Sequence, residues 1–268
     1  MSNEPPREIY THGHPAPVLQ SHRWRTAENS AGYLLAQLSP GTTVLDIGCG
    51  PGTITADFAR LVRPARVVGL DSSAEVVALA AADHRAENLT FRTGDVYELA
   101  EPNDAFDVVH AHQVLQHLGD PVRALVEMRR VCRPGGTVAV RDADYDAMVW
   151  WPDDPGLRCW LEVYRAVARA NGGEPDAGRR LLAWFHAAGY TNVTASASTW
   201  CFATPEDRAW WAHTWARRIS DSPLADRAVQ IGVASRDDLA GCAAAWMRWA
   251  DERDGYFITV HGEVLATV

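Results

Sequence analysis

Two histidines near the end of a predicted strand are the side chains of this chain best suited to proton transfer. His112 follows the apolar run that starts at Phe106, and His117 comes five residues later. The pKa of an imidazole lies near neutrality, so either ring can take a proton from an oxygen or carbon nucleophile. We expect His112 and His117 to be the catalytic bases. The competing interpretation is that each is an exposed or structurally hydrogen-bonded histidine.

A glycine-rich turn between a strand pattern and a helix pattern gives the strongest binding signal. In residues 44–52 the apolar strand ends at Asp46, and Gly48, Gly50 and Gly52 form the turn after it. Glycine permits a tight turn and lets the backbone approach a ligand closely. The free N–H groups of the following helix can then hold that ligand. The segment predicts a nucleotide-type pocket at the carboxyl end of the first strand.

Apolar runs of strand length alternate with helical patterns along the middle of the chain. Short apolar strands separated by helices imply a parallel sheet with both faces covered, which is an α/β fold. We predict strands at 44–46, 66–70, 89–93, 106–110 and 137–141, separated by helices at 53–61, from Ser72 or Ser73 to 83, and 121–131. A helix at 180–188 and strands at 193–200, 256–260 and 263–267 follow.

These features together resemble the class I S-adenosylmethionine-dependent methyltransferases, and most closely the ubiquinone/menaquinone-biosynthesis type that acts on small molecules. The resemblance rests on the glycine turn, on Asp71 ending the second strand, on Asp95-Val96 after the third, and on residues 106–115 around the fourth. It implies a Rossmann-like sheet of seven mostly parallel strands with helices on both faces. It also implies an antiparallel C-terminal hairpin, with an N-terminal helical arm and helical insertions as a lid.

The resemblance implies a site for S-adenosylmethionine, which leaves as S-adenosylhomocysteine. In related enzymes the glycine turn holds the methionine part, an acid ending the second strand binds the ribose hydroxyls, and the third strand end binds adenine. The fourth strand ends beside the methyl group, and the arm closes over the cofactor carboxylate. The cofactor-binding residues carried over are Asp46, Gly48, Cys49, Gly50, Asp71, Ser72, Asp95, Val96, Ala111, His112, Arg25 and Tyr10.

A nicotinamide or flavin dinucleotide is the competing cofactor. Its fingerprint G-x-G-x-x-G, counted from Gly48, requires a third glycine where the chain has Thr53. Asp71 suits either cofactor, whereas Asp95-Val96 favours S-adenosylmethionine. Each acid taken alone could instead be a helix cap or a solvated strand end, but the four features occur in order and at matching spacing.

Aromatic residues indicate the class of substrate. Tyr145, Trp150 and Trp151 follow the fifth strand, near the expected mouth of the site, and His14 lies in the arm. We expect these four to contact a small apolar or aromatic metabolite. The other interpretation is that the tryptophans, several of which recur at helical spacing between 210 and 249, pack insertion helices against the sheet.

The chain divides into segments of different expected roles. We assign 1–40 to the helical arm or lid, 41–143 to the cofactor-binding core, 144–178 to an insertion lining the substrate pocket, 179–203 to a core helix and strand, 204–254 to a helical insertion, and 255–268 to the final strands.

The amino-acid composition limits the kinds of partner that we expect for this protein. The formal net charge of -9 argues against a nucleic-acid surface. The five scattered cysteines form no C-x-x-C pair, which favours the reducing cytoplasm, predicts no metal site and disfavours arsenite methylation. A polar start and the lack of a long apolar run predict a protein without a membrane partner.

We expect methyl transfer to a small molecule; the alternative is a protein of this fold that binds S-adenosylmethionine for regulation or cyclisation. The oligomeric state stays open.

Overall fold

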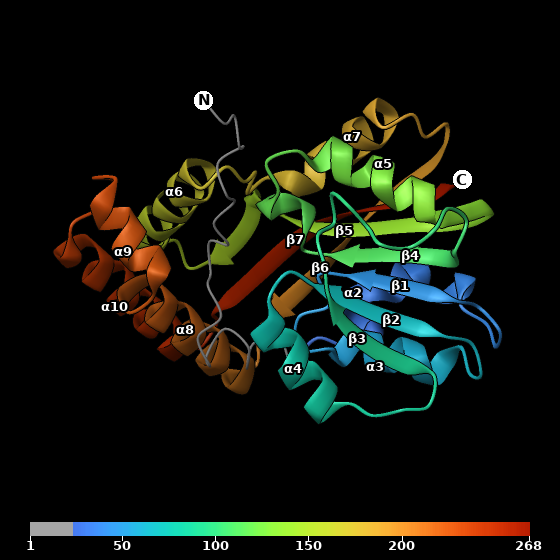
Figure 1. Ribbon diagram of the computed structural model, residues 1–268. Helices are drawn as coiled ribbons and strands as arrows, with labels where there is room; N and C mark the ends of the chain where they lie inside the picture. Colours follow the sequence, from blue (N-terminus) through green and yellow to red (C-terminus); the bar gives the residue numbers. More distant parts are fainter. Residues whose placement is uncertain (1–23) are drawn as a thin grey trace.

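A seven-stranded sheet runs through residues 24–268, the part of the chain that this computed structural model describes (Figure 1). Its strands are β1 (Val44–Ile47), β2 (Val67–Asp71), β3 (Leu89–Thr93), β4 (Phe106–His112), β5 (Cys132–Trp151), β6 (Asn192–Phe202) and β7 (Tyr256–Thr267). They lie in the order β3-β2-β1-β4-β5-β7-β6. The pairings among β1 to β5 are parallel, and β7 is antiparallel to both β5 and β6. The predicted α/β sheet, mostly parallel with an antiparallel C-terminal part, is confirmed.

Helices cover both faces because successive residues of a strand point to opposite sides of the sheet. Val44 packs with Phe58 of α3, whereas Leu45, the next residue of β1, packs with Leu125 of α5 and Phe185 of α7. Figure 1 shows α5 and α7 on one face and α2 and α3 on the other. The helices around the sheet are α2 (Ala27–Ala31), η1 (Gly32–Gln37), α3 (Thr53–Leu61), α4 (Ala74–Asp83), η2 (Leu115–His117), α5 (Pro121–Val131), η3 (Ala177–Arg180) and α7 (Leu181–Ala187).

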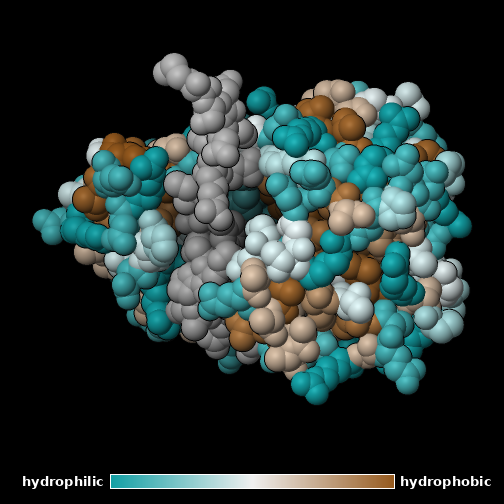
Figure 2. Space-filling model, viewed as in Figure 1, coloured by the Kyte–Doolittle hydropathy of each residue, from teal (hydrophilic) through white to brown (hydrophobic). Residues whose placement is uncertain are grey.

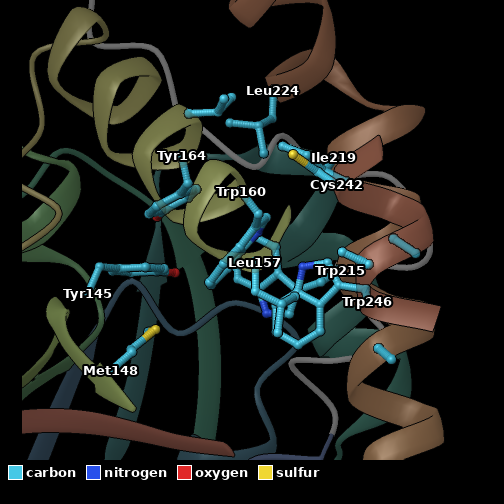
Figure 3. Packing of buried hydrophobic residues seen from close by; sticks show 14 of the residues in the cluster. Tyr145, Met148, Leu157, Trp160, Tyr164, Trp215, Ile219, Leu224, Cys242 and Trp246 are labelled. Atoms are coloured by element: carbon cyan, nitrogen blue, oxygen red, sulfur yellow. The ribbon is translucent and has the colours of Figure 1, made fainter. Parts of the chain in front are cut away.

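A second group of helices, which we call the helical lobe, lies beside the sheet at the left of Figure 1. It consists of α6 (Pro155–Ala170), α8 (Pro205–Ser220), α9 (Pro223–Gln230) and α10 (Arg236–Asp251). The ring centroid of Trp160 on α6 lies 4.6 Å from that of Trp215 on α8 and 4.8 Å from that of Trp246 on α10 (Figure 3). All three side chains are fully buried. These tryptophans, one from each of three helices, therefore pack together in the core of the lobe.

Local capping sets where several helices begin. The Thr204 hydroxyl accepts a hydrogen bond from the backbone N–H of Asp207 at 3.1 Å, and Pro205 occupies the first turn of α8. Ser73 caps α4 in the same way through the N–H of Val76 at 3.4 Å. Ser73 is one of the two start residues predicted for its helix, and both caps form because a hydroxyl satisfies a backbone donor that the helix leaves open.

Two strands differ from the prediction. The two short strands expected at 256–260 and 263–267 are one strand, β7, because Gly262 does not form a turn; it lets the backbone of Gly178 pack against the strand. Similarly, β5 continues past the predicted end at 141, since β7 pairs with it from Thr137 to Trp151.

The described residues contain no helix with both the length and the apolar character that a membrane crossing requires. Figure 2 shows hydrophilic side chains spread over both the sheet side and the helical lobe, with apolar residues in small groups between them.

Candidate functional site

A cleft of about 220 Å³ opens where β1, β2, β3 and β4 end. Ligands of open α/β sheets bind at this edge, because the strand ends and the following loops meet there. The predicted residues that line the cleft are Arg25, Asp46, Gly48, Cys49, Gly50, Asp71, Ser72, Asp95, Val96, His112 and His117. Residues from five separate segments of the chain are thus brought to one site.

The glycine turn is held in a shape that a larger residue would disturb. Gly48 and Gly52 have φ values of 64° and 81°, in the left-handed region. A Cβ atom on Gly48 would collide with the side chain of Val114, and one on Gly52 would lie 2.7 Å from Cζ of Phe91. The turn therefore packs directly against the side chain of Val114, which follows β4, and against that of Phe91 in β3.

Asp46 holds this turn in place through hydrogen bonds. Its Oδ1 lies 2.7 Å from Nδ1 of His110 on β4, and its Oδ2 accepts a hydrogen bond from the Thr55 hydroxyl at 2.6 Å. His110 is completely buried, and so is Thr55 in the first turn of α3. The carboxylate links the end of β1 to its neighbouring strand and to the following helix. No local pattern indicates this pairing, since His110 and Asp46 are 64 residues apart.

Asp71 connects the turn to the second strand. Its Oδ2 accepts from the N–H of Gly50 and its Oδ1 from the N–H of Ser73, both at 3.0 Å. A carboxylate has about four acceptor positions, so each oxygen keeps one for a ligand. At the third strand end, Asp95 Oδ1 accepts from the N–H of Tyr97 at 2.8 Å.

His112 and His117 lie on the wall of the cleft and are both neutral at pH 7. The His112 side chain is only 6% exposed, and neither ring nitrogen has a hydrogen-bond partner among residues 24–268. Burial, followed by the charges of Arg141 and Arg25, holds its pKa well below the usual value. Burial also lowers the pKa of His117 to about 3. The side-chain amide of Gln116 donates to Nε2 of His117 at 3.0 Å.

A polar chain that sequence reasoning missed runs from the cleft into the sheet. Arg25 Nη2 donates to Oε1 of Gln113 at 2.7 Å, and Gln113 Nε2 lies 2.9 Å from Nε2 of His261. Arg141 Nη2 donates to the other nitrogen of His261 at 3.0 Å, and its Nε pairs with Glu263 at 3.2 Å. Gln113 has a φ of 54°, unusual for a residue other than glycine.

A second, smaller cavity of about 20 Å³ lies next to the cleft, and Arg25 and Gln113 line both. We call it the inner cavity. Its other described lining residues are Trp24, Tyr145, Met148, Trp200, Trp210, Trp211, Trp215, Arg218 and Thr259. The ring centroid of Trp24 lies 5.2 Å from that of Trp200 and 5.5 Å from that of Trp210. One wall of the inner cavity is therefore aromatic.

Apart from Ala111, four predicted site residues lie elsewhere or outside the described chain. Trp150 and Trp151 line neither cavity, because β5 continues past Tyr145 and carries them to the far end of β7; Trp150 stacks on Phe257 and Trp151 is 62% exposed. Tyr10 and His14 precede residue 24 and lie outside the described residues.

Ala111 also lies off the cleft wall. It is fully buried in the apolar cluster that includes Leu125 of α5, on the opposite side of β4 from His112. Because successive side chains of a strand point to opposite faces, only one of two neighbouring residues can face the cleft.

Comparison with known proteins places the chain among methyltransferases. A model of the methyltransferase domain matches residues 38–189. An uncharacterized methyltransferase of Schizosaccharomyces pombe is 35% identical over 276 residues, which cover 99% of this chain and 98% of that protein.

Solved structures share the fold. The YcgJ protein of Bacillus subtilis superposes with a TM-score of 0.59 at 18% identity, over 88% of this chain and 96% of that one. A phosphoethanolamine N-methyltransferase 2 of Haemonchus contortus, solved with phosphomonomethylethanolamine and S-adenosylhomocysteine, has a TM-score of 0.53 at 17% identity, over 86% of this chain and 49% of that one.

Proposed function

This chain belongs to the S-adenosylmethionine-dependent methyltransferases, and we propose that it transfers the methyl group to a small apolar or aromatic metabolite in the cytoplasm. The observation that carries the proposal is the convergence of the glycine turn, Asp71 and Asp95 on one cleft at neighbouring strand ends. The chemistry of these groups matches the three parts of the cofactor.

We assign each part of the cofactor to a part of the cleft. The methionine part lies against the backbone of Gly48, Cys49 and Gly50. The ribose hydroxyls donate to the acceptor positions that Asp71 keeps after binding Gly50 and Ser73. The adenine lies at Asp95 and Val96. Arg25 reaches the cofactor carboxylate, for which a guanidinium is a suitable partner.

S-adenosylmethionine supplies a methyl group on a cationic sulfur, which a nucleophile takes in an in-line displacement. The protein contributes by holding the acceptor in line and by excluding water. Tyr145, on the wall of the inner cavity, contacts the acceptor in this proposal. The aromatic wall around Trp24 and Trp200 keeps this side of the site dry.

His112 and His117 are the proposed proton acceptors. Burial lowers both pKa values, so both rings are neutral at pH 7. His112 has no hydrogen-bond partner for its lone pair among residues 24–268, whereas the lone pair of His117 accepts from the Gln116 amide. The same shift makes each ring a weak base, because proton transfer is most effective when the pKa lies near the working pH. The pair therefore suits a nucleophile that is already ionised, or one that loses its proton only as the methyl group arrives.

Calorimetric titration of the full-length protein tests the cofactor assignment. We expect S-adenosylmethionine and S-adenosylhomocysteine to bind with micromolar affinity and NAD not to bind. Release of S-adenosylhomocysteine with an acceptor then separates methyl transfer from the alternative, a protein that binds the cofactor without transferring its methyl group. Binding of NAD in place of the adenosyl compounds would overturn the proposal.

A further inference from the structure

The inner cavity has the size of a single small chemical group. About 20 Å³ exceeds the roughly 10–15 Å³ that one water molecule requires, but is far below the volume of a metabolite. Arg25 and Gln113 belong to its wall and to the wall of the cofactor cleft. A molecule that places one end group in the inner cavity therefore extends past these two residues toward the cofactor.

The charged residues among the described lining of this cavity are positive. Its described lining residues include the guanidinium groups of Arg25 and Arg218 and no carboxylate. Arg218 is only 6% exposed and lies over the ring of Trp215, with its Cζ 5.2 Å from the ring centroid. Arg25 lies over the ring of Trp200 in the same way, at 5.5 Å. Little water reaches Arg218, so its charge acts strongly on a group inside the cavity, whereas Arg25 is half-buried.

Helix α8 supplies much of this wall by its periodicity. Trp211, Trp215 and Arg218 are four and seven residues apart along α8, which puts them on one side of the helix. The position of Arg218 is therefore fixed by the same packing that buries the tryptophans.

Two hydrogen-bonding groups on the wall lack partners. Nε1 of Trp211 and Oγ1 of Thr259 are buried and have no hydrogen-bond partner within residues 24–268. An indole N–H can only donate, and a hydroxyl donates readily. A buried donor without an acceptor is destabilising, so an acceptor that enters here satisfies both groups.

From these observations we propose that the methyl acceptor is a carboxylic acid whose carboxylate lies in the inner cavity, held by Arg218 and by the Trp211 and Thr259 donors, with Arg25, which reaches the cofactor carboxylate, at the edge of the cavity. This rests on the proposed methyl transfer and names its substrate class. A carboxylate is small enough for the cavity, and its negative charge complements the guanidinium groups of the wall. Its oxygens accept hydrogen bonds from the buried donors. Its charge also balances the cationic sulfur of the cofactor.

Matched acids and amides test the proposal by calorimetry on the full-length protein saturated with S-adenosylhomocysteine. The probes are benzoate, cinnamate and indole-3-acetate, each against its primary amide. We expect at least one acid to bind about tenfold or more tightly than its amide, since only the acid pairs with the guanidinium groups.

Variants assign the effect to the cavity. Arg218→Gln should remove the preference for the acid and Arg218→Lys should keep part of it, while the affinity for S-adenosylhomocysteine stays unchanged because Arg218 does not line the cleft. Trp211→Phe and Thr259→Val should each weaken acid binding several-fold. Arg208→Gln is the matched control: Arg208 lies on the same helix with the same 6% exposure but donates to the carbonyls of Ala250 and Ala203.

The outcomes separate this inference from the proposed function. If S-adenosylhomocysteine itself does not bind, the proposed function fails. If it binds and the acids bind no better than the amides, or none of the acids binds, only the carboxylate inference fails. Equal losses of acid binding in Arg218→Gln and Arg208→Gln would also overturn it, because they would show a general effect on α8.

Discussion

Arg25 and Gln113 meet at the boundary between the cofactor cleft and the inner cavity, where Arg25 Nη2 donates to Gln113 Oε1 at 2.7 Å. The two residues are 88 positions apart in the chain, and both line both cavities. Gln113 is in turn bound at its backbone, where its N–H donates to the carbonyl of Arg141 at 2.7 Å. The contact thus ties the segment before α2 to the end of β4, at the point where cofactor and acceptor meet in our proposal.

Substitution of Gln113 by Asn is expected to slow turnover while leaving the protein folded. Asn tolerates the left-handed backbone that Gln113 adopts, but its shorter side chain cannot reach both Arg25 and His261. We expect a fall in kcat of about tenfold, with a thermal midpoint close to that of the parent, measured by S-adenosylhomocysteine release and thermal unfolding. Unchanged kcat would show that the link has no part in catalysis.

Removal of the Asp71 carboxylate is expected to weaken the binding of the cofactor. Asp71→Ala loses the ribose acceptors and also the hydrogen bonds to Gly50 and Ser73 that hold the turn. We expect the dissociation constant for S-adenosylmethionine to rise about tenfold or more. Glu75→Ala, in the first turn of the neighbouring α4, is the control and should bind normally. Equal affinities for the two variants would refute the ribose assignment.

Alanine at Gly48 is expected to cost both stability and cofactor affinity. The left-handed backbone alone costs a residue with a Cβ roughly 1–2 kcal/mol, and the new methyl group also collides with Val114. Gly41→Ala is the control, since Gly41 has a φ of 99° but open space around it. We expect a larger drop in thermal midpoint for Gly48→Ala, partly restored by Val114→Ala. Equal drops for the two glycines would show that the contact with Val114 is unimportant.

Asp142 should lower the free energy of unfolding as the pH rises from 3.8 to about 8. Burial raises the pKa of this acid from 3.8 to about 8. Because the folded-state pKa lies above that of the unfolded chain, its contribution to stability is complete below pH 3.8 and is lost as the pH rises through about 8. The associated slope is at most about 1.4 kcal/mol per pH unit.

The Asp142→Asn variant tests this slope by urea unfolding at several pH values. Asn keeps an oxygen for the N–H of Gln116, which lies 3.3 Å from Oδ1, and it has no proton to lose. The free energy of unfolding should therefore decline less between about pH 6 and 9 in this variant. The exposed Glu87→Gln should behave like the parent. A parent slope that survives in Asp142→Asn would point to another group.

The buried histidines should not titrate near neutrality. The pKa of His117 is about 3, and that of His112 lies well below its usual value. In NMR spectra of histidine-labelled protein, their ring signals should stay constant between about pH 5 and 8, while exposed imidazoles shift. His117→Gln and His112→Gln assign the two signals. A midpoint near 6.5 for either ring would show that water reaches it and that the ring is a stronger base than proposed.

The sequence by itself determined the α/β alternation, most strand positions, the start of α4 near Ser73, and the glycine turn with Asp71 at the next strand end. Each depends on residues that are close in the chain: an apolar run, a hydroxyl three positions before its donor, glycines in a tight turn. The meeting of Asp71 with the turn followed as well, because parallel strands end at one edge.

Only the tertiary structure determined which residues of distant elements lie opposite one another. The sequence put a turn at Gly262, but pairing with β5 and β6 makes this residue part of one strand, and the same pairing carries Trp150 and Trp151 away from the site. Gln113 contacts His261 across 148 positions of the chain. Such contacts are selected by the packing of whole elements, whose energy no local pattern encodes, and they alone build the inner cavity beside the cofactor cleft.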